Sequence, residues 1–573
     1  MFSETNSQAT TSLYFSNIDV IDVTTGAVKP EMLVGICGNR ITALGKKGEI
    51  QPSHDARVIN GSGKFLIPGL WDMHVHWYYR DYLPLFIVNG VTGIRQMWGV
   101  SEHQQWCREM EQGSLACPRM EIGSEIVDGP KPVWPGSIRA SNAAEARQVV
   151  RLVKKHGFDF VKIYAHLPRE AFFALADEAH KINIPYAGHI PQAVTASEAS
   201  RARQKSIEHM DGILRSCSSQ EEGLRQRMLS ALEEQNYREA TRNAGRKNLK
   251  ITLETQDKAK TTELIKCFAQ NITWQCPTFT VSRNMAWSGD PIISDDPRIN
   301  YMPRAIRSLW KPATDFRLNT RTEEDATLFK RAHQLRLDMV PQMLQAGVPF
   351  LAGTDTLNPF CFPGFSLHDE FELLYEAGLS PLQVVQSATL NAALYRGTLA
   401  SEGTIEVGKV ADLVVLEANP LESVSNTRKI QGVVLNGRYF TRDDLITMKR
   451  NIAVLAQKKS VAEELLPIIT ESGISPAIAH YHQLKTTSPD DYEFGPDELN
   501  AIGQQLMNLN KNDEAIRIFK LNLENYPEHW ESYDNLAEAY TSNKDFGLAR
   551  ENFRNSLKYN PHNIHAIQML EIM

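Results

Sequence analysis

Short apolar runs alternate with helical stretches through the middle of this chain of 573 residues. The apolar runs have the length of buried strands, and the stretches between them carry apolar residues at helical spacing. This order of strand and helix recurs over about residues 64–396, and it favours a parallel sheet that is covered by helices. The length and the number of units predict an α/β fold with a (β/α)8 barrel, and a doubly wound open sheet is the second interpretation.

The expected elements of this middle region can be placed along the chain. Strands are expected at residues 65–67, 93–97, 160–164, 186–190, 206–210, 272–278 and 349–354. Helices are expected at residues 143–156, 168–183 and 322–346. The charge-rich stretch 211–271 is expected to form a helical excursion on the barrel.

Two β-rich segments bracket this middle region. Residues 12–63 contain short runs of β-forming residues that are separated by turns. A similar pattern returns far along the chain, at residues 397–445. We therefore expect strands on both sides of the barrel in the sequence.

The C-terminal tail repeats with a period of 34 residues. The positions Ala515, Phe519, Leu523 and Pro527 recur as Ala549, Phe553, Leu557 and Pro561. This period predicts an all-α domain of tetratricopeptide-type hairpins at residues 491–573, preceded by a helical linker or degenerate repeat at 446–490. The first interpretation of the hairpins is a structural cap or a self-association arm, and the second is a groove for a protein partner.

Metal-binding residue types stand where the expected strands end. His74 and His76 are two residues apart after the first strand, so both imidazoles can project to one face. His189, His209 and Asp355 close later strands. The active sites of βα barrels lie at these strand ends, and nitrogen and carboxylate donors suit zinc or another divalent first-row ion. Each residue alone could be a hydrogen-bonded core residue, but five at strand ends indicate a metal site.

Lys162 is an unexpected residue for a barrel strand. It shares its strand face with Phe160 and Tyr164, so an unpaired ammonium there would be costly. One interpretation is a lysine that extends to solvent or pairs with a carboxylate. The functional interpretation is a lysine that has reacted with carbon dioxide to give a carbamate, whose two oxygens can bridge two metal ions.

Several motifs resemble the amidohydrolase superfamily, and in particular its imidazolonepropionase-like and prolidase-like branch. The motifs are PGLWDMHVH, VKIYAHLPREAF, AGHIPQ, SIEHM, AGTDT, SLHDEFELLYEAGLSP, SATLNAA and GTIEVGKVADLVVLEANPL. They span about residues 12–445. The resemblance implies a distorted (β/α)8 barrel at 64–396 and a discontinuous β-sandwich domain built from 12–63 and 397–445.

The resemblance also implies a metal centre and a mechanism. Metal ligands are expected at His74, His76, Lys162, His189, His209 and Asp355. We expect two Zn²⁺ ions bridged by carboxylated Lys162, with a metal-bound hydroxide as the nucleophile. Asp355 is expected to accept the water proton and to pass it to the leaving amine.

Other residues near the expected site carry weaker hypotheses. Tyr164 is expected either to donate to the developing oxyanion or to pack in the barrel. His166 and His368 are placed in loops after the fourth and eighth strands, where they could contact substrate or be solvated. For Arg95 a structural ion pair is the first interpretation, and binding of a substrate carboxylate is the second. Gln192 replaces the glutamate of related deaminases, which disfavours deamination.

The resemblance implies a hydrolase of amide bonds in a small peptide or N-acyl amino acid, similar to Xaa-Pro dipeptidases. Hydrolysis of a lactone or phosphotriester at the same metals is the alternative enzyme, and a repeat-mediated binding scaffold is the alternative of another class. The formal net charge of -7 provides no basic face for nucleic-acid phosphates, so no such partner is expected.

The sequence shows neither a membrane-spanning segment nor a secretory signal. No apolar run approaches the ~20 residues that a membrane-spanning helix needs. Residues 1–11 are polar and lack the regions of a secretory signal. We expect a soluble protein that is cytoplasmic, or exported if a signal was removed before Met1.

Overall fold

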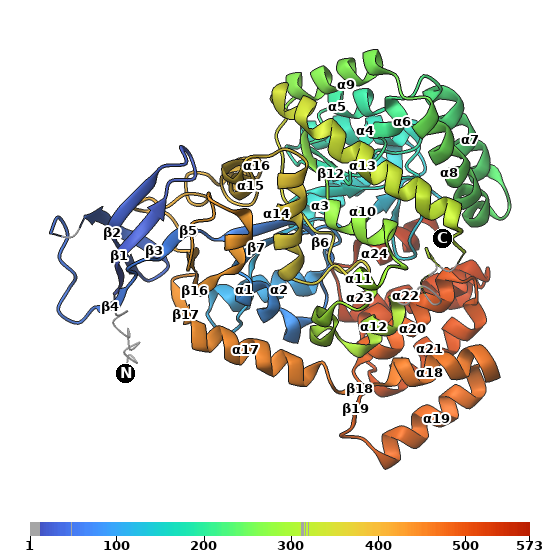
Figure 1. The fold of residues 1–573 in the computed structure, drawn as a ribbon. Helices are drawn as coiled ribbons and strands as arrows, with labels where there is room; N and C mark the ends of the chain where they lie inside the picture. The colour runs from blue at the N-terminus through green and yellow to red at the C-terminus, as the bar shows by residue number, and fades with distance from the viewer. Residues whose placement is uncertain (1–11, 47, 311–314, 316, 319) are drawn as a thin grey trace.

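The computed structural model describes residues 12–573, except residues 47, 311–314, 316 and 319. It shows a mixed α/β fold in which a curled parallel sheet is flanked by a separate terminal sheet and by a group of C-terminal helices (Figure 1). The polar leader at residues 1–11 lies outside the described residues. Among the helices that are described, none combines the length and the apolarity needed to cross a membrane.

The terminal sheet joins the two β-rich flanks of the chain. Its strands follow the order β17-β16-β15-β5-β1-β2-β3, and β4 pairs with β1 beside this path. The bounds are β1 (Leu13–Ile21), β2 (Val28–Cys37), β3 (Arg40–Lys46), β4 (Arg57–Asn60), β5 (Phe65–Pro68), β15 (Leu413–Leu416), β16 (Ile430–Leu435) and β17 (Arg438–Thr441). Strand β5 connects the flanks, because it pairs parallel with β1 and antiparallel with β15. Figure 1 shows the blue N-terminal strands beside the orange β16 and β17.

The expected strand at residues 65–67 belongs to this terminal sheet, as β5, so its assignment to the barrel was wrong. The chain passes through Gly69 into β6 (Leu70–Val75), where the curled sheet begins. The Gly69 N–H donates to the Asp412 carbonyl at 2.8 Å. A Cβ atom on Gly69 would lie 2.0 Å from Oγ1 of Thr92, so a residue without a side chain is required where the two sheets meet.

The curled sheet consists of parallel strands. They pair in two groups, β6-β7-β8 and β10-β9-β11-β12-β13-β14. The remaining bounds are β7 (Val91–Gln96), β8 (Arg119–Ile122), β9 (Val127–Asp128), β10 (Ile138–Arg139), β11 (Val161–Ile163), β12 (Tyr186–Gly188), β13 (Ser206–Glu208) and β14 (Trp274–Cys276). Isolated parallel bridges join Gly123 to Phe160, Gln275 to Phe350 and Thr356 to Val75. The segment 350–356 therefore lies between β14 and β6. Because the strands are parallel, their carboxyl ends lie together at one end of the curled sheet.

Helices pack around the curled sheet (Figure 1). Their bounds are α1 (Pro84–Val88), α2 (Ser101–Glu111), α3 (Ala143–Lys155), α4 (Arg169–Lys181), α5 (Ala196–Arg201), α6 (Ile213–Ser216), α7 (Glu221–Glu233), α8 (Tyr237–Glu254), α9 (Lys258–Gln270), α10 (Phe279–Ala286), α11 (Pro291–Ser294), α12 (Arg304–Leu309), α13 (Glu323–Gln345), α14 (Phe365–Glu376), α15 (Pro381–Ser387) and α16 (Leu390–Arg396). The expected helices are α3, α4 and α13, and the expected excursion consists of α6 to α9. Local signals set the helix starts: the Asn142 side chain caps α3, and Thr322 forms a capping box with Asp325 at α13.

The C-terminal helices form hairpins with a hydrophobic core of their own. They are α18 (Val461–Ser472), α19 (Ile474–Thr487), α20 (Pro496–Asn508), α21 (Asn512–Asn525), α22 (Trp530–Ser542), α23 (Phe546–Tyr559) and α24 (Ile564–Ile572). The preceding helix α17 (Arg442–Leu455) packs instead on α1 and β16. The repeated residues Ala515, Phe519, Ala549 and Phe553 are all fully buried in this core. The period of 34 residues therefore marks equivalent packing positions of successive hairpins.

The junction of the two sheets provides a stability test. We expect Gly69→Ala to lower the free energy of unfolding by about 1–3 kcal/mol, because the added methyl group meets the fully buried Thr92. Gly245→Ala is the matched control, since a Cβ there meets no atom within 4 Å and the residue lies inside α8. That control should be neutral or stabilise by up to about 1 kcal/mol. Denaturant unfolding measures both variants, and equal stabilities would contradict the steric argument.

Candidate metal centre

The residues predicted to bind metal meet at one end of the curled sheet. His74 lies on β6, His76 just after it, Lys162 on β11, His189 after β12, His209 after β13, and Asp355 at the end of the segment 350–354. The carboxyl ends of parallel strands share one edge, so residues far apart in sequence come together there.

Asp355 lies at the centre of the group. Its Oδ1 atom is 3.3 Å from the Nε2 atoms of both His74 and His76. Its Oδ2 atom is 3.8 Å from Nδ1 of His209. Burial opposes ionisation of this carboxyl, but the nearby His209 and His74 hold the pKa of Asp355 well below its usual value.

His189 joins the group through its ring contacts. Its ring centroid is 4.7 Å from that of His209 and 4.0 Å from that of Tyr164. The other side of His189 faces Asp211, with Nδ1 and Oδ2 3.4 Å apart. The ring of His209 lies in turn 4.6 Å from that of His74, so the imidazoles form one continuous cluster.

The side chains fit a divalent cation. Two ligands at about 2.0 Å from a zinc ion in tetrahedral geometry lie roughly 3.3 Å apart, which matches the separation of Asp355 Oδ1 from each imidazole. The ligand atoms of His74, His209 and Asp355 are all within 4.8 Å of one another. His74 Nε2 is buried and forms no hydrogen bond within the described part of the chain, so a bound cation would satisfy it.

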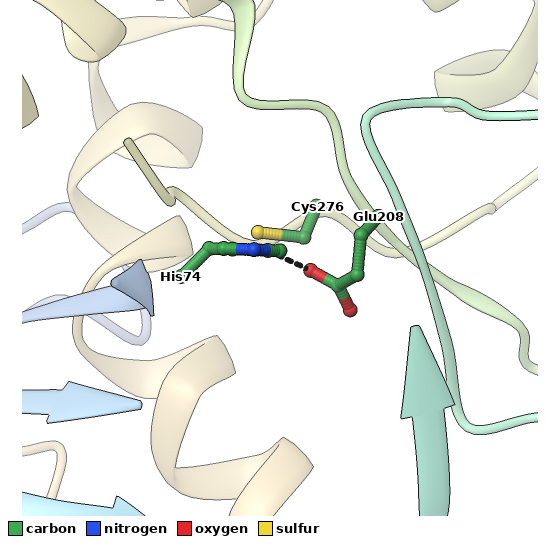
Figure 2. Close-up of side chains that lie close together, drawn as sticks. All are labelled: His74, Glu208 and Cys276. Atoms are coloured by element: carbon green, nitrogen blue, oxygen red, sulfur yellow. Dashed lines mark hydrogen bonds and ion pairs between the residues drawn. The ribbon is translucent and has the colours of Figure 1, made fainter. Parts of the chain in front are cut away.

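Glu208, which the sequence analysis did not single out, orients His74 (Figure 2). The Nδ1 atom of His74 donates to Oε2 of Glu208 at 2.7 Å, and both side chains are fully buried. This hydrogen bond places the ring proton on Nδ1 and leaves the Nε2 lone pair directed at the site. Glu208 directly precedes His209, and that adjacency was the sequence signal for it.

Arg95 holds Glu208 from the opposite side. One guanidinium nitrogen donates to both carboxylate oxygens, at 2.9 and 2.8 Å, and the side chain is fully buried. Burial raises the pKa of Glu208, but Arg95 and the hydrogen bond from His74 outweigh this effect and lower it. Arg95 is thus paired with Glu208 and is absent from the described lining of the cavity near these residues, so its contacts favour the structural ion pair.

Cys276 is the third side chain drawn in Figure 2. Its sulfur lies within 4.8 Å of ligand atoms of His74 and Glu208. Burial raises the pKa of the thiol well above its usual value, and the thiol donates to the Met73 carbonyl at 3.8 Å. Cys276 therefore packs beside His74 and Glu208 and directs its thiol hydrogen at the β6 backbone.

The loop that carries Asp355 is tied to β6 by a second buried carboxyl. Thr354 donates to Asp72 through its hydroxyl at 2.6 Å and through its backbone N–H at 3.0 Å. Burial raises the pKa of Asp72 to about 7. Asp355 and His209 have positive φ angles of 60° and 62°, which non-glycine residues rarely adopt. Such strain is common at functional sites, and it occurs here at the turns that aim both side chains inward.

Lys162 is fully buried on β11, as its strand position predicted. Its Nζ atom forms no hydrogen bond to any described residue and lies 5.9 Å from the ring centroid of Tyr164. Burial lowers the pKa of this amine to about 8. An ammonium without a hydrogen-bond partner is costly in such a place, so burial favours the neutral amine.

Tyr164 lies at the edge of the same cluster. Its hydroxyl accepts a hydrogen bond from Nε1 of Trp134 at 2.9 Å, which leaves the phenol proton available. Burial raises the pKa of Tyr164, so the phenol stays protonated and can donate. Tyr164 lines a cavity of about 640 Å³ together with His76, His189, His209 and Asp355.

His166 and His368, the two histidines that were predicted to contact substrate, do not line this cavity. His166 lies in a turn after β11, where its Nδ1 atom contacts the Lys131 carbonyl at 2.8 Å. His368 lies within α14, not in a loop as predicted, and is buried. Its ring nitrogens contact Thr427 Oγ1 at 2.9 Å and the Asn89 carbonyl at 3.0 Å. Both rings are held by structural contacts away from the described lining of the cavity.

Comparisons with known proteins agree with this architecture. The Amidohydrolase family model matches residues 330–439. The fold is similar to a structure titled bottromycin amidohydrolase, with 24% identity and a TM-score of 0.61 over 78% of this chain and 90% of that chain. No curated protein sequence matches this chain.

Two further solved structures share the fold at lower identity. A Xaa-Pro dipeptidase with bound methionine in its active site is 18% identical, with a TM-score of 0.54 over 75% of this chain and 100% of that chain. The ochratoxinase of A. niger is 18% identical, with a TM-score of 0.51 over 76% of this chain and 96% of that chain. At these identities the likeness establishes the fold.

The role of Glu208 can be measured through metal affinity. We expect Glu208→Gln to weaken Zn²⁺ binding about 10- to 100-fold, because the carboxylate that polarises and orients His74 is lost. Competition with a chromogenic chelator measures the affinity. Glu170→Gln on the exposed surface of α4 is the control and should bind Zn²⁺ as the native chain does.

A second variant separates orientation from folding. Glu208→Gln leaves the Arg95 charge buried without its partner, which should cost about 3–5 kcal/mol of stability. The double variant Arg95→Met and Glu208→Gln removes that charge, so stability should partly return while Zn²⁺ affinity stays low. Native affinity in a folded variant would show that Glu208 does not orient the site.

Proposed function

We propose that this chain is a metal-dependent hydrolase that cleaves an amide bond of a small peptide or N-acyl amino acid, as a Xaa-Pro dipeptidase does. The observation that carries the proposal is the convergence of His74, His76, His209 and Asp355, in which the buried Nε2 atom of His74 forms no hydrogen bond to a described residue. The match to the Amidohydrolase family and the fold shared with an amidohydrolase and a dipeptidase support it.

The domain organisation belongs to the same proposal. We infer that the curled sheet is a distorted (β/α)8 barrel at residues 64–396, and that the terminal sheet is a composite β-sandwich domain of 12–63 and 397–445. Residues 491–573 are assigned as tetratricopeptide-type repeats behind a linker at 446–490. The ring of parallel strands and the buried residues at the 34-residue period support these assignments.

The cofactor we infer is a pair of divalent ions, with zinc favoured by the donor set. His74 and His76 would hold one ion, His189 and His209 the other, and carboxylated Lys162 would bridge them, with Asp355 as a further ligand. Ions bound there would polarise a scissile carbonyl and lower the pKa of water toward neutrality. The buried Lys162 amine supports the carbamate, since the added group would gain partners that the ammonium lacks.

The protein groups have separate tasks in amide hydrolysis. Asp355 has a second carboxylate oxygen that can accept the proton of the attacking water and deliver it to the leaving amine. Tyr164 keeps its phenol proton and can donate a hydrogen bond to the carbonyl oxygen as negative charge develops there. Glu208 and Arg95 act through His74 as positioning residues.

Two alternatives remain distinct from this proposal. A lactone or phosphotriester hydrolase would use the same ligands, and only its substrate would differ. A protein-binding scaffold would use the C-terminal hairpins, with the curled sheet as a structural support. The converging ligand set favours an enzyme, because a scaffold needs neither the buried imidazoles nor the buried lysine.

The carbamate predicts how Lys162→Ala changes metal content. We expect about two ions per native chain in bicarbonate buffer, fewer in the variant, and a loss of dipeptide turnover. Lys154→Ala is the control, because Lys154 is exposed at the end of α3. Elemental analysis and a dipeptide panel measure both effects. A single ion that is unaffected by Lys162→Ala would contradict the binuclear centre.

Tyr164→Phe tests the proposed oxyanion donor. We expect kcat to fall about 100- to 1000-fold, with KM changed much less, because the donor acts mainly on the transition state. The phenyl ring preserves the contact with His189, so metal content should stay at the native level. Steady-state kinetics would contradict the role if kcat were unchanged.

A further inference from the structure

The cavity at the metal-binding residues reaches the C-terminal helices. One end is lined by His76, His209 and Asp355. The other end is lined by residues of α20, α22 and α24. A ligand that fills the cavity would therefore touch both the curled sheet and the helical hairpins.

The lining residues occupy one face of each helix. On α20 they include Asp497, Asn500, Gln504 and Asn508, which are three or four positions apart. On α22 they include Trp530 and Glu531, and His565 contributes from α24. These are the first helices of successive hairpins, so the face that stacked hairpins commonly offer to a partner is directed here at the cavity.

Specific contacts hold the hairpins in this position. Arg139 on β10 pairs with Glu538 of α22 at 2.8 Å, and its backbone N–H donates to Gln568 of α24 at 2.6 Å. Trp530 donates from its indole nitrogen to Glu102 of α2. The helices therefore form a fixed wall at the end of the sheet where the metal-binding residues lie.

This wall is acidic. Asp497 and Glu531 line the cavity from the helices, and Glu125 lines it from the loop between β8 and β9. Glu125 is 5% exposed, and its Oε2 atom has no hydrogen-bond partner among the described residues. An orphaned, buried carboxylate oxygen that lines a cavity indicates a missing donor or cation.

Repulsion among these carboxyl groups also indicates that a cation is missing from the cavity. Burial and the charge of Glu531 raise the pKa of Asp497 to about 6, and they also raise that of Glu102. Burial raises the pKa of Glu125 to about 8. His529 lies 3.4 Å from Glu531 and is the cationic partner of that carboxyl. Burial lowers the pKa of His565, but Asp534 and Glu538 outweigh this effect and raise it to about 10, so His565 is a second cation that lines the cavity. A positively charged ligand would relieve the repulsion.

Aromatic rings complete the same region. Tyr78 and Trp530 line the cavity, as do Tyr79 and Trp98. The Tyr78 hydroxyl donates to the Trp98 carbonyl at 3.1 Å, which fixes the ring in the cavity lining that also includes Glu125 and Glu531. Tyr78 is two residues beyond His76, which ties this region to the metal-binding end. Tyrosine and tryptophan faces attract ammonium and guanidinium groups.

We propose that Glu125, Asp497, Glu531, Tyr78 and Trp530 form a cation-accepting subsite, so that the enzyme selects substrates with an ammonium or guanidinium group remote from the scissile amide. This inference rests on the proposed function and adds its substrate class. The subsite combines carboxylates with aromatic rings. A site for an uncharged part of a peptide would need neither.

The arginines of the same cavity lie in other surroundings. Burial lowers the pKa of Arg321 and of Arg336. The negative charge of Asp315 opposes this effect at Arg321, and that of Asp211 opposes it at Arg336. Asp211 faces His189 at the metal-binding end. The arginines of the cavity therefore have carboxylates of their own, which are distinct from Asp497 and Glu531.

Matched substrates test this selection. Peptides that contain lysine or arginine would be compared with the same peptides containing acetyl-lysine or citrulline, placed on either side of the scissile amide. We expect kcat/KM about tenfold or more higher for the cationic member in one of the two placements. The double variant Asp497→Asn and Glu531→Gln should abolish this preference by raising KM for the cationic peptides, so that their kcat/KM falls to that of the neutral peptides.

The control has the same change in charge. Glu524→Gln with Glu551→Gln alters exposed residues on α21 and α23, away from the cavity, and should keep the preference. Glu125→Gln is a single variant that should reduce the preference if the double variant folds poorly. Equal kcat/KM for charged and neutral peptides in the native enzyme would overturn the inference.

A binding measurement separates this inference from the proposed function. Ketomethylene analogues of the cationic and neutral peptides cannot be hydrolysed, and equilibrium dialysis with the full chain reports their affinities. If no peptide is cleaved, cation-selective binding that is lost in the double variant still supports the subsite. Equal binding of both analogues overturns it, whatever the catalytic result.

Discussion

A fully buried ion pair between Arg95 and Glu208 is the interaction on which the candidate site depends. Removing two charges from water is costly, and such a pair persists only when its remaining hydrogen bonds are made. Arg95 also donates to the Met73 carbonyl and to the Tyr395 hydroxyl, at 2.6 and 2.7 Å. Glu208 then has one oxygen for His74. The pair thus links three strands and fixes the direction of one imidazole.

The curled sheet brings the other candidate ligands to the imidazole that this ion pair orients. Because the strands are parallel, their carboxyl ends lie together, and the turns after β13 and the segment 350–354 direct His209 and Asp355 inward with positive φ angles. Asp72 ties the second of these turns to β6. The positions of the ligands therefore depend on buried carboxyls outside the ligand set.

The C-terminal hairpins add to the site what the curled sheet lacks. Their own core makes them a stable unit, and their contacts with Arg139 and Glu102 place α20 and α22 over the cavity. A face that stacked hairpins elsewhere present to partners becomes part of the cavity wall. Substrate choice would then be shared by two domains, while the chemistry stays with the strand ends.

The sequence alone determined the alternation of strands and helices, the repeat of the tail, and the strand-end positions of His74, His209 and Asp355, because these follow from local periodicity. It could not assign β5 to the terminal sheet, since a short apolar run reads the same in either sheet. It also did not single out Glu208 or Asp72, and it placed His368 in a loop. Those outcomes depend on contacts between distant segments, as does the meeting of Glu125, Asp497 and Glu531, which only the tertiary structure decided.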